Sequence, residues 1–414
     1  MTPGRVIVVG SGIVGASCAY ELALRGWSVE LIDRAAFGAG CSHGNCGYIC
    51  PSHVYPLARP GAIAATLPLM FRPNSPFKVR IRPDLSLLAW FAKFSRCCDA
   101  RKAEETSIAL HALLVAAKVR YEEIMALEKI DCDYEARGCL FISMHEAHMS
   151  AFEADNRRMI DRFGYGARRL NGAELARMEP TLRDGLGGAW MFDCDSHLRS
   201  DRFMSGMKAV LTRRGVVIRE NCEARALEGS GERAATLATS RGPLRADAFV
   251  FATGAWTPLL SELIGIRLPI VPGKGYSVTA RRPAHCPAYP MVFDEHRVAI
   301  TPFGTGYRIG STMEFAGYDE RLRPERIALL KDSAALYLRH SEPLADEEPW
   351  WGWRPMVPDG RPFIDFVPRF KNVMVAAGHS MIGMSTGPAT GQLVAEMLGG
   401  EEPHLEPGWF RVGR

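Results

Sequence analysis

The first 34 residues contain a complete nucleotide-binding pattern, and this pattern limits the fold more than any other stretch. Residues 5–10 (RVIVVG) form a short apolar run rich in β-branched side chains, which is typical of a strand buried on both faces of a parallel sheet. Gly10, Gly12 and Gly15 follow with G-x-G-x-x-G spacing, in which the glycines allow a tight turn, a close pyrophosphate and close helix packing. We therefore expect a strand–turn–helix unit that binds a dinucleotide.

A helix and a second strand complete this unit. Residues 13–25 present small alanines and end at Gly26, which suits a left-handed C-terminal cap. The next strand, residues 27–33 (WSVELID), ends in Asp33, where a carboxylate accepts hydrogen bonds from ribose hydroxyls. Because this carboxylate would repel the 2′-phosphate of NADP, the expected cofactor is FAD or NAD.

Composition limits the partners and the setting of the protein. The 414 residues carry 50 basic and 46 acidic side chains, so we expect no nucleic acid as the main partner. With 47% hydrophobic residues, the chain can bury a large core in two closely connected domains. No apolar run approaches the roughly 18 residues of a membrane span and no signal peptide is evident, so we expect a cytoplasmic protein. The cysteines form no C-x-x-C pairs and are expected to be thiols.

Residues 36–61 are dense in Gly, Ser, Asn and Pro, which predicts a long loop without helix or strand. This loop follows the nucleotide-binding strand and is placed to run along the cofactor. Cys41, Cys46 and Cys50 lie in it at spacings that match no zinc or iron–sulfur pattern. We therefore expect small buried thiols here and no metal.

Periodicity predicts the remaining elements. Residues 61–71 are apolar and precede Lys78, Arg80 and Arg82; we interpret them as a buried segment with a basic edge, or alternatively as a peripheral membrane contact. The expected helices are 85–126 (broken around 101–106), 145–163 and 388–398, and the expected strands are 138–144, 216–221, 246–254, 269–280, the hairpin 298–312, and 372–378. The strands from 269 to 312 alternate and turn on glycine, which predicts a second, antiparallel sheet.

Several stretches resemble the FAD-dependent amine oxidoreductases that include D-amino acid oxidase, glycine oxidase and bacterial D-amino acid dehydrogenase. These stretches are 10–34, 250–258 (VFATGAWTP), 353–365 (WRPMVPDGRPFID) and 373–398, and the loop 42–61 is most similar to the D-amino acid dehydrogenases. We expect a fold of α/β plus α+β class. Its FAD-binding, Rossmann-like doubly wound domain would comprise residues 1–85, 195–265 and 352–414, and its antiparallel-sheet substrate domain residues 86–194 and 266–351.

The resemblance also implies which residues contact the cofactor. They are Gly10, Gly12, Ile13, Val14, Gly15, Asp33, Arg34, Ser42, Asn45, Cys46, Gly47, Ala224, Gly254, Gly378, Ser380, Met381, Ile382, Gly383 and Met384. In this set Ala224 would meet the adenine through its backbone. Helix-start amides at residues 380–383 would stabilise negative charge on reduced flavin.

Arg354 matches the arginine that binds the substrate carboxylate in the resembling enzymes. A guanidinium suits this role because its planar fork forms two parallel hydrogen bonds with a carboxylate. We expect Arg354 to be the catalytic residue that places the substrate. Tyr55, His53, Tyr276 and His379 are expected to line the same pocket.

The implied activity is dehydrogenation of D-amino acids, including proline-type substrates, to an imine that water hydrolyses to a 2-oxo acid. Electrons would pass to a quinone or partner protein, which allows a position peripheral to the inner membrane, whereas the relation to glycine oxidase leaves oxygen open. Met381 stands where glycine oxidase carries a second arginine, and Ala299 is the closest match to its pocket tyrosines.

Three alternatives stand beside this expectation. His43 lies one position from the histidine that tethers FAD in some relatives, so we expect non-covalent FAD. A non-catalytic flavoprotein is disfavoured by Arg354. An NAD-dependent dehydrogenase is disfavoured by the long loop after the second strand and by the C-terminal glycine turn.

Overall fold

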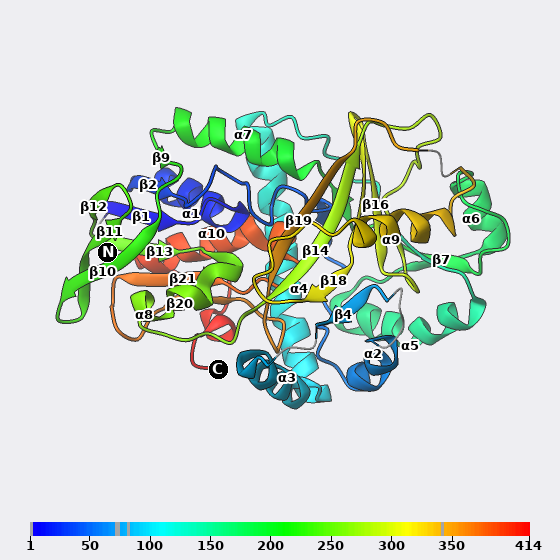
Figure 1. Ribbon diagram of the computed structural model, residues 1–414, viewed down its shortest axis with the longest axis horizontal. Coiled ribbons are helices and arrows are strands. Elements are labelled where there is room, and N and C mark those ends of the chain that lie inside the picture. Colours follow the sequence, from blue (N-terminus) through cyan, green and yellow to red (C-terminus); the bar gives the residue numbers. More distant parts are fainter. Residues whose placement is uncertain (1–2, 71–74, 81–82, 341–342) are drawn as a thin grey trace.

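Two large sheets organise the molecule in this computed structural model (Figure 1), which describes residues 3–70, 75–80, 83–340 and 343–414. Arg82 lies outside these ranges. The first sheet consists of β20 (Phe363–Phe366), β21 (Val373–Ala377), β13 (Ala248–Phe251), β1 (Arg5–Val9), β2 (Ser28–Ile32) and β9 (Val217–Arg219), in that order. Its strands are parallel except β20, which is antiparallel to β21. This sheet contains the predicted nucleotide-binding strands.

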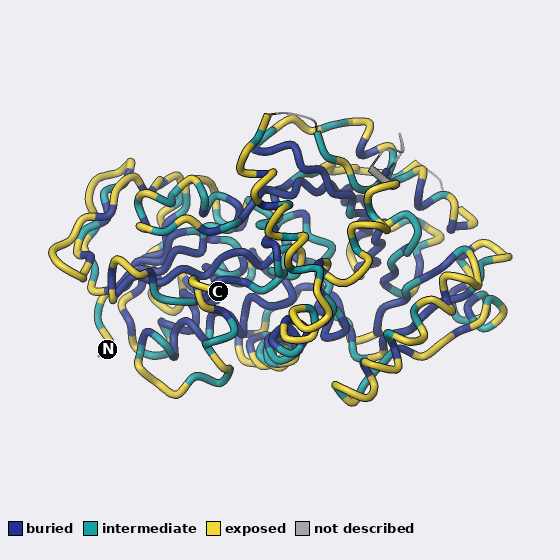
Figure 2. Tube along the Cα trace, turned by 90° about the horizontal axis from the view of Figure 1, so that it is seen from below, coloured by how far each residue is buried: buried dark blue, intermediate teal, exposed yellow. Residues whose placement is uncertain are grey.

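Alternate residues of β1 face opposite sides of this first sheet. Val6 and Val8 pack against helices, while Ile7 and Val9 pack on the other side. The helical side is covered by α1 (Ile13–Leu24), α4 (Ala100–Glu128), α7 (Ser200–Arg213) and α10 (Gly383–Gly399), and the other side by β10 (Ala224–Ser230), β11 (Arg233–Thr239), β12 (Gly242–Arg245) and α8 (Ser261–Ile264). Figure 2 shows the resulting buried centre of this part, with exposed loops around it.

Small residues let α1 and α10 pack closely beside the glycine-rich turn. A Cβ added at Gly387 would lie 2.6 Å from Ile13 Cγ1, and one at Gly391 would lie 2.5 Å from the Ser17 backbone. Side chains at these two positions would force the helices apart. The two helices therefore begin next to one another, on the side of the sheet where the cofactor is expected.

The second sheet is mixed but mainly antiparallel. Its order is β4 (Phe77–Val79), β18 (Met313–Phe315), β14 (Val271–Ala280), β17 (Gly306–Gly310), β16 (Val298–Phe303), β15 (Met291–Phe293), β5 (Cys139–Ser143), β7 (Gly188–Phe192) and β6 (Arg168–Asn171), and β19 (Glu348–Met356) pairs with β14. The helix α9 (Pro324–Ala335) packs on it through Ile327 and Leu330, while α5 (Glu146–Phe163) lies near β7. The predicted strands and the predicted hairpin are confirmed.

Tertiary pairing adds one strand to the stretch expected to be loop. Within residues 36–61, β3 (Tyr48–Ile49) pairs with β8 (Ser196–His197), so the expectation of no strand was wrong. The partner strand lies far away in the sequence, and local composition carries no sign of it. This short ladder fixes the loop against the segment that leads into α7.

Two helix boundaries also differ from the expectation. The break in 85–126 falls at Cys98–Asp99, between α3 (Leu85–Cys97) and α4, because the Asp99 side chain accepts from Lys102 N and caps the second helix. Likewise, α10 begins at Gly383 rather than Pro388. Pro388 cannot donate to the Met384 carbonyl four residues earlier, and the Tyr121 hydroxyl donates to that carbonyl instead, at 2.6 Å.

The described side chains of the apolar run 61–71 are mostly exposed. Its described part contains α2 (Ala62–Met70), in which Ile63 is 43% and Leu67 51% exposed. Arg80, expected on a solvated basic edge, pairs with the buried Glu314 at 2.5 Å. Within the described residues, none of the helices combines the length and hydrophobicity that a bilayer crossing requires.

The domain boundaries stay a prediction. All six strands of the first sheet come from the segments assigned to the FAD-binding domain. However, α4 falls in the segment assigned to the substrate domain and contributes Leu113, Ala117 and Tyr121 to the core beneath the first sheet. Similarly, β19 crosses the boundary at 351/352.

Candidate active site

The glycine-rich turn brings three backbone segments into close contact. Gly10 has φ +102°, and a Cβ there would lie 2.4 Å from the Ala252 carbonyl oxygen. A Cβ at Gly15 would lie 1.7 Å from the Gly10 carbonyl oxygen. The next helix, α1, has Gly12 as its N-cap residue, which provides no side-chain cap, and no acidic residue in its first turn. Its positive end is therefore available to an anion such as a pyrophosphate.

Asp33 and Ser42 tie neighbouring segments to this turn. Asp33 Oδ2 accepts from Ser11 N at 2.7 Å and from Ser11 Oγ at 2.8 Å. Ser42 Oγ accepts from Ile13 N at 2.9 Å. Cys222 N donates to the Asp33 carbonyl, which places Ala224, the first residue of β10, close to the end of β2. These predicted cofactor residues thus gather around one end of the first sheet.

The other predicted contacts at this end are more exposed. Arg34 is exposed, and its guanidinium lies 5.6 Å from the centre of the Trp256 ring. Gly254 has φ +53° at the start of a short 3-10 helix, Gly254–Leu260. His43, the histidine near the position of a covalent tether, bonds Glu348 Oε1 through Nε2 at 2.7 Å.

The loop that contains Asn45, Cys46 and Gly47 is anchored by a buried arginine that the sequence analysis missed. Gly47 has φ +76°, and a Cβ there would lie 1.8 Å from the Leu198 carbonyl oxygen. Arg308 is 1% exposed; its guanidinium donates to the Asn45 carbonyl and pairs with Asp201 at 3.0 Å. Burial lowers the pKa of Arg308. The alternating hairpin pattern gives no sign that one of its arginines is buried.

The C-terminal turn, residues 378–384, lies against the end of β19. Gly378 has φ +83°, and a Cβ there would lie 2.7 Å from Val357 Cγ1. Ser380 N donates to the Pro355 carbonyl at 3.1 Å. The helix α10 begins after Ile382 without a side-chain cap or an acidic residue in its first turn. The N-terminus of α10 is therefore a second helix start without a side-chain cap. The hydrogen bond from Ser380 N to Pro355 places the turn before it beside Arg354 and Pro355.

Arg354 is a half-buried cation with neutral neighbours. Its guanidinium lies over the backbone of Gly275 on β14, where an added Cβ would be 2.4 Å from Arg354 Cζ. It donates to the Thr312 carbonyl at 2.8 Å and to Ser311 Oγ at 3.1 Å. Among the residues that the structure describes, it makes no ion pair, and burial lowers its pKa. A partly desolvated guanidinium without an acidic partner favours an anionic ligand.

Alternation along β14 separates Tyr276 from this guanidinium. Tyr276 follows Gly275 and points to the opposite face, where its hydroxyl donates to Glu314 Oε2 at 2.7 Å. Its ring belongs to the core beneath α9. Tyr276 thus shares no face of the sheet with the Arg354 guanidinium.

The other three residues predicted to line the pocket are held by different groups. The Tyr55 hydroxyl donates to the Asp155 carbonyl at 2.9 Å. His379 is 2% exposed and bonds Thr390 Oγ1 at 3.0 Å; burial lowers its pKa to about 3, so it is neutral at physiological pH. His53 lies beside Phe141. In the described part of the chain, none of them has a hydrogen bond with Arg354.

Comparison with known proteins identifies the family. Residues 5–397 match the family described as FAD dependent oxidoreductase. The chain belongs to this family. FAD is therefore its cofactor, and the chain is an oxidoreductase. The starts of α1 and α10, which lack a side-chain cap and acidic residues in the first turn, and the glycine turn, where added Cβ atoms would clash, fit this cofactor, because a helix N-terminus attracts a pyrophosphate.

The curated relatives cover the whole chain. A D-amino acid dehydrogenase of Paramagnetospirillum magneticum is 32% identical over 96% of this chain and 95% of its own length. One of Granulibacter bethesdensis is 30% identical over 99% of both chains. Among solved structures, glycine oxidase from Geobacillus kaustophilus superposes with a TM-score of 0.80 at 23% identity over 99% of both chains. This last likeness shows the fold.

Proposed function

We propose that this FAD-dependent oxidoreductase dehydrogenates D-amino acids. The observation that carries the proposal is Arg354, a half-buried cation that donates only to neutral oxygens at the junction of β19 and the C-terminal turn. The substrate class is supported by the relatives named D-amino acid dehydrogenase. A free carboxylate on the substrate would supply the negative charge that Arg354 lacks.

The residues of this chain would bind and orient the substrate. FAD, when bound, supplies a two-electron acceptor for hydride from the substrate Cα. Arg354 would grip the carboxylate through its planar fork, and Ser311 with Thr312 would hold the guanidinium in place. The hydrogen bond from Ser380 N to the Pro355 carbonyl fixes the position of this arginine relative to the C-terminal turn.

Anaerobic mixing tests the substrate class and its stereochemistry. Purified yellow protein is mixed with D- and L-amino acids, D- and L-proline, glycine and N-methylglycine, and the flavin absorbance is followed. We expect bleaching by D-amino acids at rates at least about tenfold above those of their L-forms, because a held carboxylate and a fixed ring admit one face of Cα. Equal bleaching by both enantiomers, bleaching only by glycine or N-methylglycine, or no bleaching contradicts the proposal.

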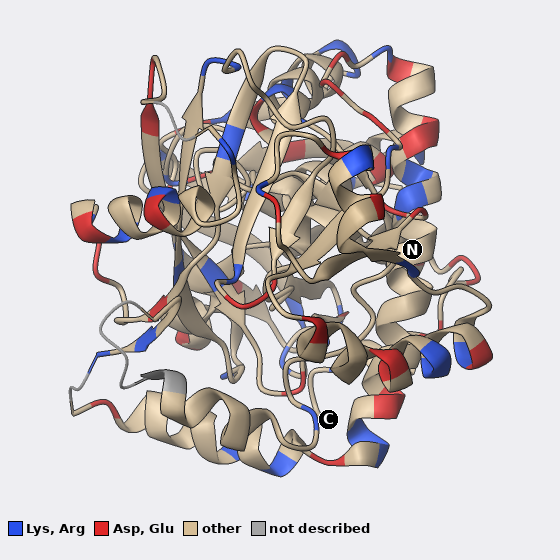
Figure 3. Ribbon diagram, turned by 90° about the vertical axis from the view of Figure 1, so that its right-hand side faces the viewer, with Lys and Arg blue, Asp and Glu red and all other residues tan. Residues whose placement is uncertain are grey.

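The electron acceptor is proposed to be a membrane quinone. Five exposed leucine and isoleucine side chains lie on α2, on α3 and just before them: Leu57 (49%), Ile63 (43%), Leu67 (51%), Leu85 (83%) and Leu88 (63%). We call these five residues the α2–α3 surface; both helices lie at the lower edge of the molecule in Figures 1 and 3. Strongly exposed apolar side chains that gather on neighbouring elements are typical of an interaction site.

Exposed cations accompany the α2–α3 surface. Lys78, Lys93 and Arg96 are exposed on β4 and α3. Apolar side chains that insert between lipids, with basic side chains beside them, suit an anionic membrane surface. Such contact would bring the reduced enzyme to a quinone dissolved in the bilayer.

The double variant Leu67→Asp/Leu88→Asp tests this surface. Each aspartate replaces a side chain whose insertion is worth about 1 to 2 kcal/mol, so we expect turnover with quinone in anionic vesicles to fall by roughly 10- to 100-fold. Reduction of a water-soluble dye should keep its rate. Leu127→Asp is the matched control, because Leu127 is 63% exposed at the far end of α4.

Two results contradict the acceptor proposal. One is equal quinone turnover by the double variant, the control and the parent. The other is stoichiometric peroxide formation in air at the rate of dye reduction, which would make the protein an oxidase.

A further inference from the structure

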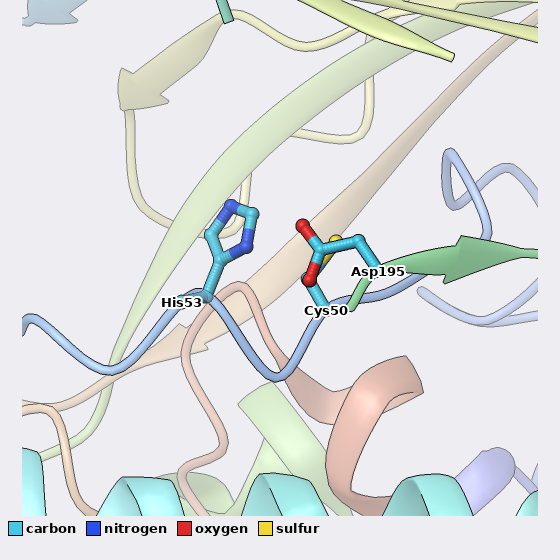
Figure 4. Close-up of side chains that lie close together, drawn as sticks. All are labelled: Cys50, His53 and Asp195. Carbon is cyan, nitrogen blue, oxygen red and sulfur yellow. The ribbon is translucent and has the colours of Figure 1, made fainter. Parts of the chain in front are cut away.

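A cluster of three metal-ligating side chains lies outside the site around Arg354. Cys50 Sγ, a ring nitrogen of His53 and a carboxylate oxygen of Asp195 all lie within 4.8 Å of one another. Figure 4 shows the three side chains converging from the loop and from the start of β8. Cys50 is 1% and Asp195 0% exposed, and His53 is half-buried. We propose that these residues bind a zinc ion.

The fold builds this cluster from two turns. Ile49 pairs with Ser196 in the antiparallel β3–β8 ladder, so Cys50 and Asp195 occupy the next opposite positions. Residues 50–53 (CPSH) form a turn in which His53 N donates to the Cys50 carbonyl at 3.2 Å. Proline at the second position favours such a turn and brings its first and last residues together. The three ligands therefore meet because of register and turn geometry, not because of sequence spacing.

Asp195 is a buried carboxylate without a cationic partner. No ion pair involves it among the residues that the structure describes. Ser52 orients it instead, since Oδ1 accepts from Ser52 N at 3.1 Å and Oδ2 from Ser52 Oγ at 2.6 Å. Outer partners of this kind hold metal-ligating carboxylates in place. A divalent cation would balance the charge that the protein leaves unpaired here.

Thiolate, imidazole and carboxylate together match zinc. Zinc binds them at about 2.0 to 2.3 Å in tetrahedral geometry, which places neighbouring ligand atoms roughly 3.3 to 3.8 Å apart. The three ligand atoms, all within 4.8 Å of one another, would have to move closer to reach these values on binding. On binding, the Cys50 S–H bond breaks, the proton goes to solvent and an S–Zn bond forms. The fourth position is left for water.

Zinc in this position would fix the loop beside the flavin. The Gly47 carbonyl accepts from Leu198 N at 2.9 Å, and Ser200 Oγ donates to the Asn45 carbonyl at 3.0 Å. Asn45 and Gly47 lie shortly before Cys50 in the sequence, and their partners lie shortly after Asp195. A cross-link between Cys50, His53 and Asp195 would hold both segments together.

The test is a metal titration of the FAD-loaded protein after treatment with a chelator. We expect one zinc per chain, and one cobalt that gives d–d bands in the red, beyond the absorption of oxidised flavin. Zinc should also raise the thermal midpoint of unfolding, since a site assembled by the fold binds it more tightly than the unfolded chain does. Cys50→Ser, His53→Gln and Asp195→Asn should each weaken binding on the order of 100-fold.

Matched variants separate this site from adventitious binding. Cys222→Ser removes a thiol that is also 1% exposed, and His111→Gln removes a half-buried histidine of α4; both should bind zinc as the parent does. Binding by Cys50→Ser equal to that of the parent, or no cobalt bands in the red, overturns the proposal.

A second measurement covers variants that lose FAD or fail to fold. Thiol labelling of the parent protein, read by mass spectrometry, should show Cys50 protected by zinc and Cys222 unaffected. Labelling of Cys50 at the same rate with and without zinc overturns the proposal. Neither readout depends on the substrate or on the electron acceptor.

Discussion

Replacing Arg354 with alanine is expected to lower the second-order rate of flavin reduction by on the order of 30- to 1000-fold with the best D-amino acid. A charge-assisted, bidentate pair that is partly closed to water contributes roughly 2 to 4 kcal/mol, because its loss leaves the substrate carboxylate buried and unpaired. Arg354→Lys should recover only part of the rate, since an ammonium supplies charge without the planar fork. Stopped-flow absorbance under anaerobic conditions measures both variants.

Two controls make this result specific to the carboxylate. FAD content should stay near that of the parent, because the nucleotide turn at Gly10–Gly15 is built from other segments. Arg297→Ala removes an arginine whose side chain is 65% exposed and should leave the rate unchanged. If Arg354→Ala and Arg354→Lys both reduce their flavin at the parent rate, another residue holds the carboxylate and the assignment of the pocket is wrong.

Gly15→Ala is expected to abolish FAD binding and to yield colourless or unfolded protein. A Cβ at this position would lie 1.7 Å from the Gly10 carbonyl oxygen, and backbone cannot rotate away as a flexible side chain can. The helix would have to move away from β1, and with it the amides that face the pyrophosphate. Flavin absorbance per protein, measured on the purified variant and after reconstitution with FAD, tests this expectation.

Gly26→Ala is the matched control for glycine loss. Gly26 has a left-handed backbone, φ +81°, whereas Gly15 lies within α1, and a Cβ added at Gly26 meets nothing within 4 Å. The strain costs about 1 to 2 kcal/mol and should lower stability without removing FAD. A yellow Gly15→Ala protein with full FAD content would show that the helix can shift without loss of the cofactor.

Local patterns were sufficient to predict the nucleotide-binding unit. The run 5–10, the spacing of Gly10, Gly12 and Gly15, and the position of Asp33 are local signals, and the structure has the predicted strand, helix and second strand. The strands of the second sheet were also predictable, because alternation and glycine turns are local signals. The resemblance to known flavoenzymes added Arg354, whose significance no local pattern could show.

Contacts between distant segments decided the rest. Residues far apart in the sequence form the β3–β8 ladder and bury Arg308 against the Asn45 carbonyl. The α2–α3 surface is exposed because no distant segment that the structure describes covers its five side chains. The same holds for Tyr276, which alternation along β14 turns away from Arg354. Cys50 showed no metal-binding spacing in sequence, yet strand register and one turn bring it to His53 and Asp195. The sequence by itself determined most of the elements and a dinucleotide cofactor, FAD or NAD, because these follow from periodicity and glycine placement. Only the tertiary structure decided which charges are buried without partners, because burial and pairing are properties of the packed chain.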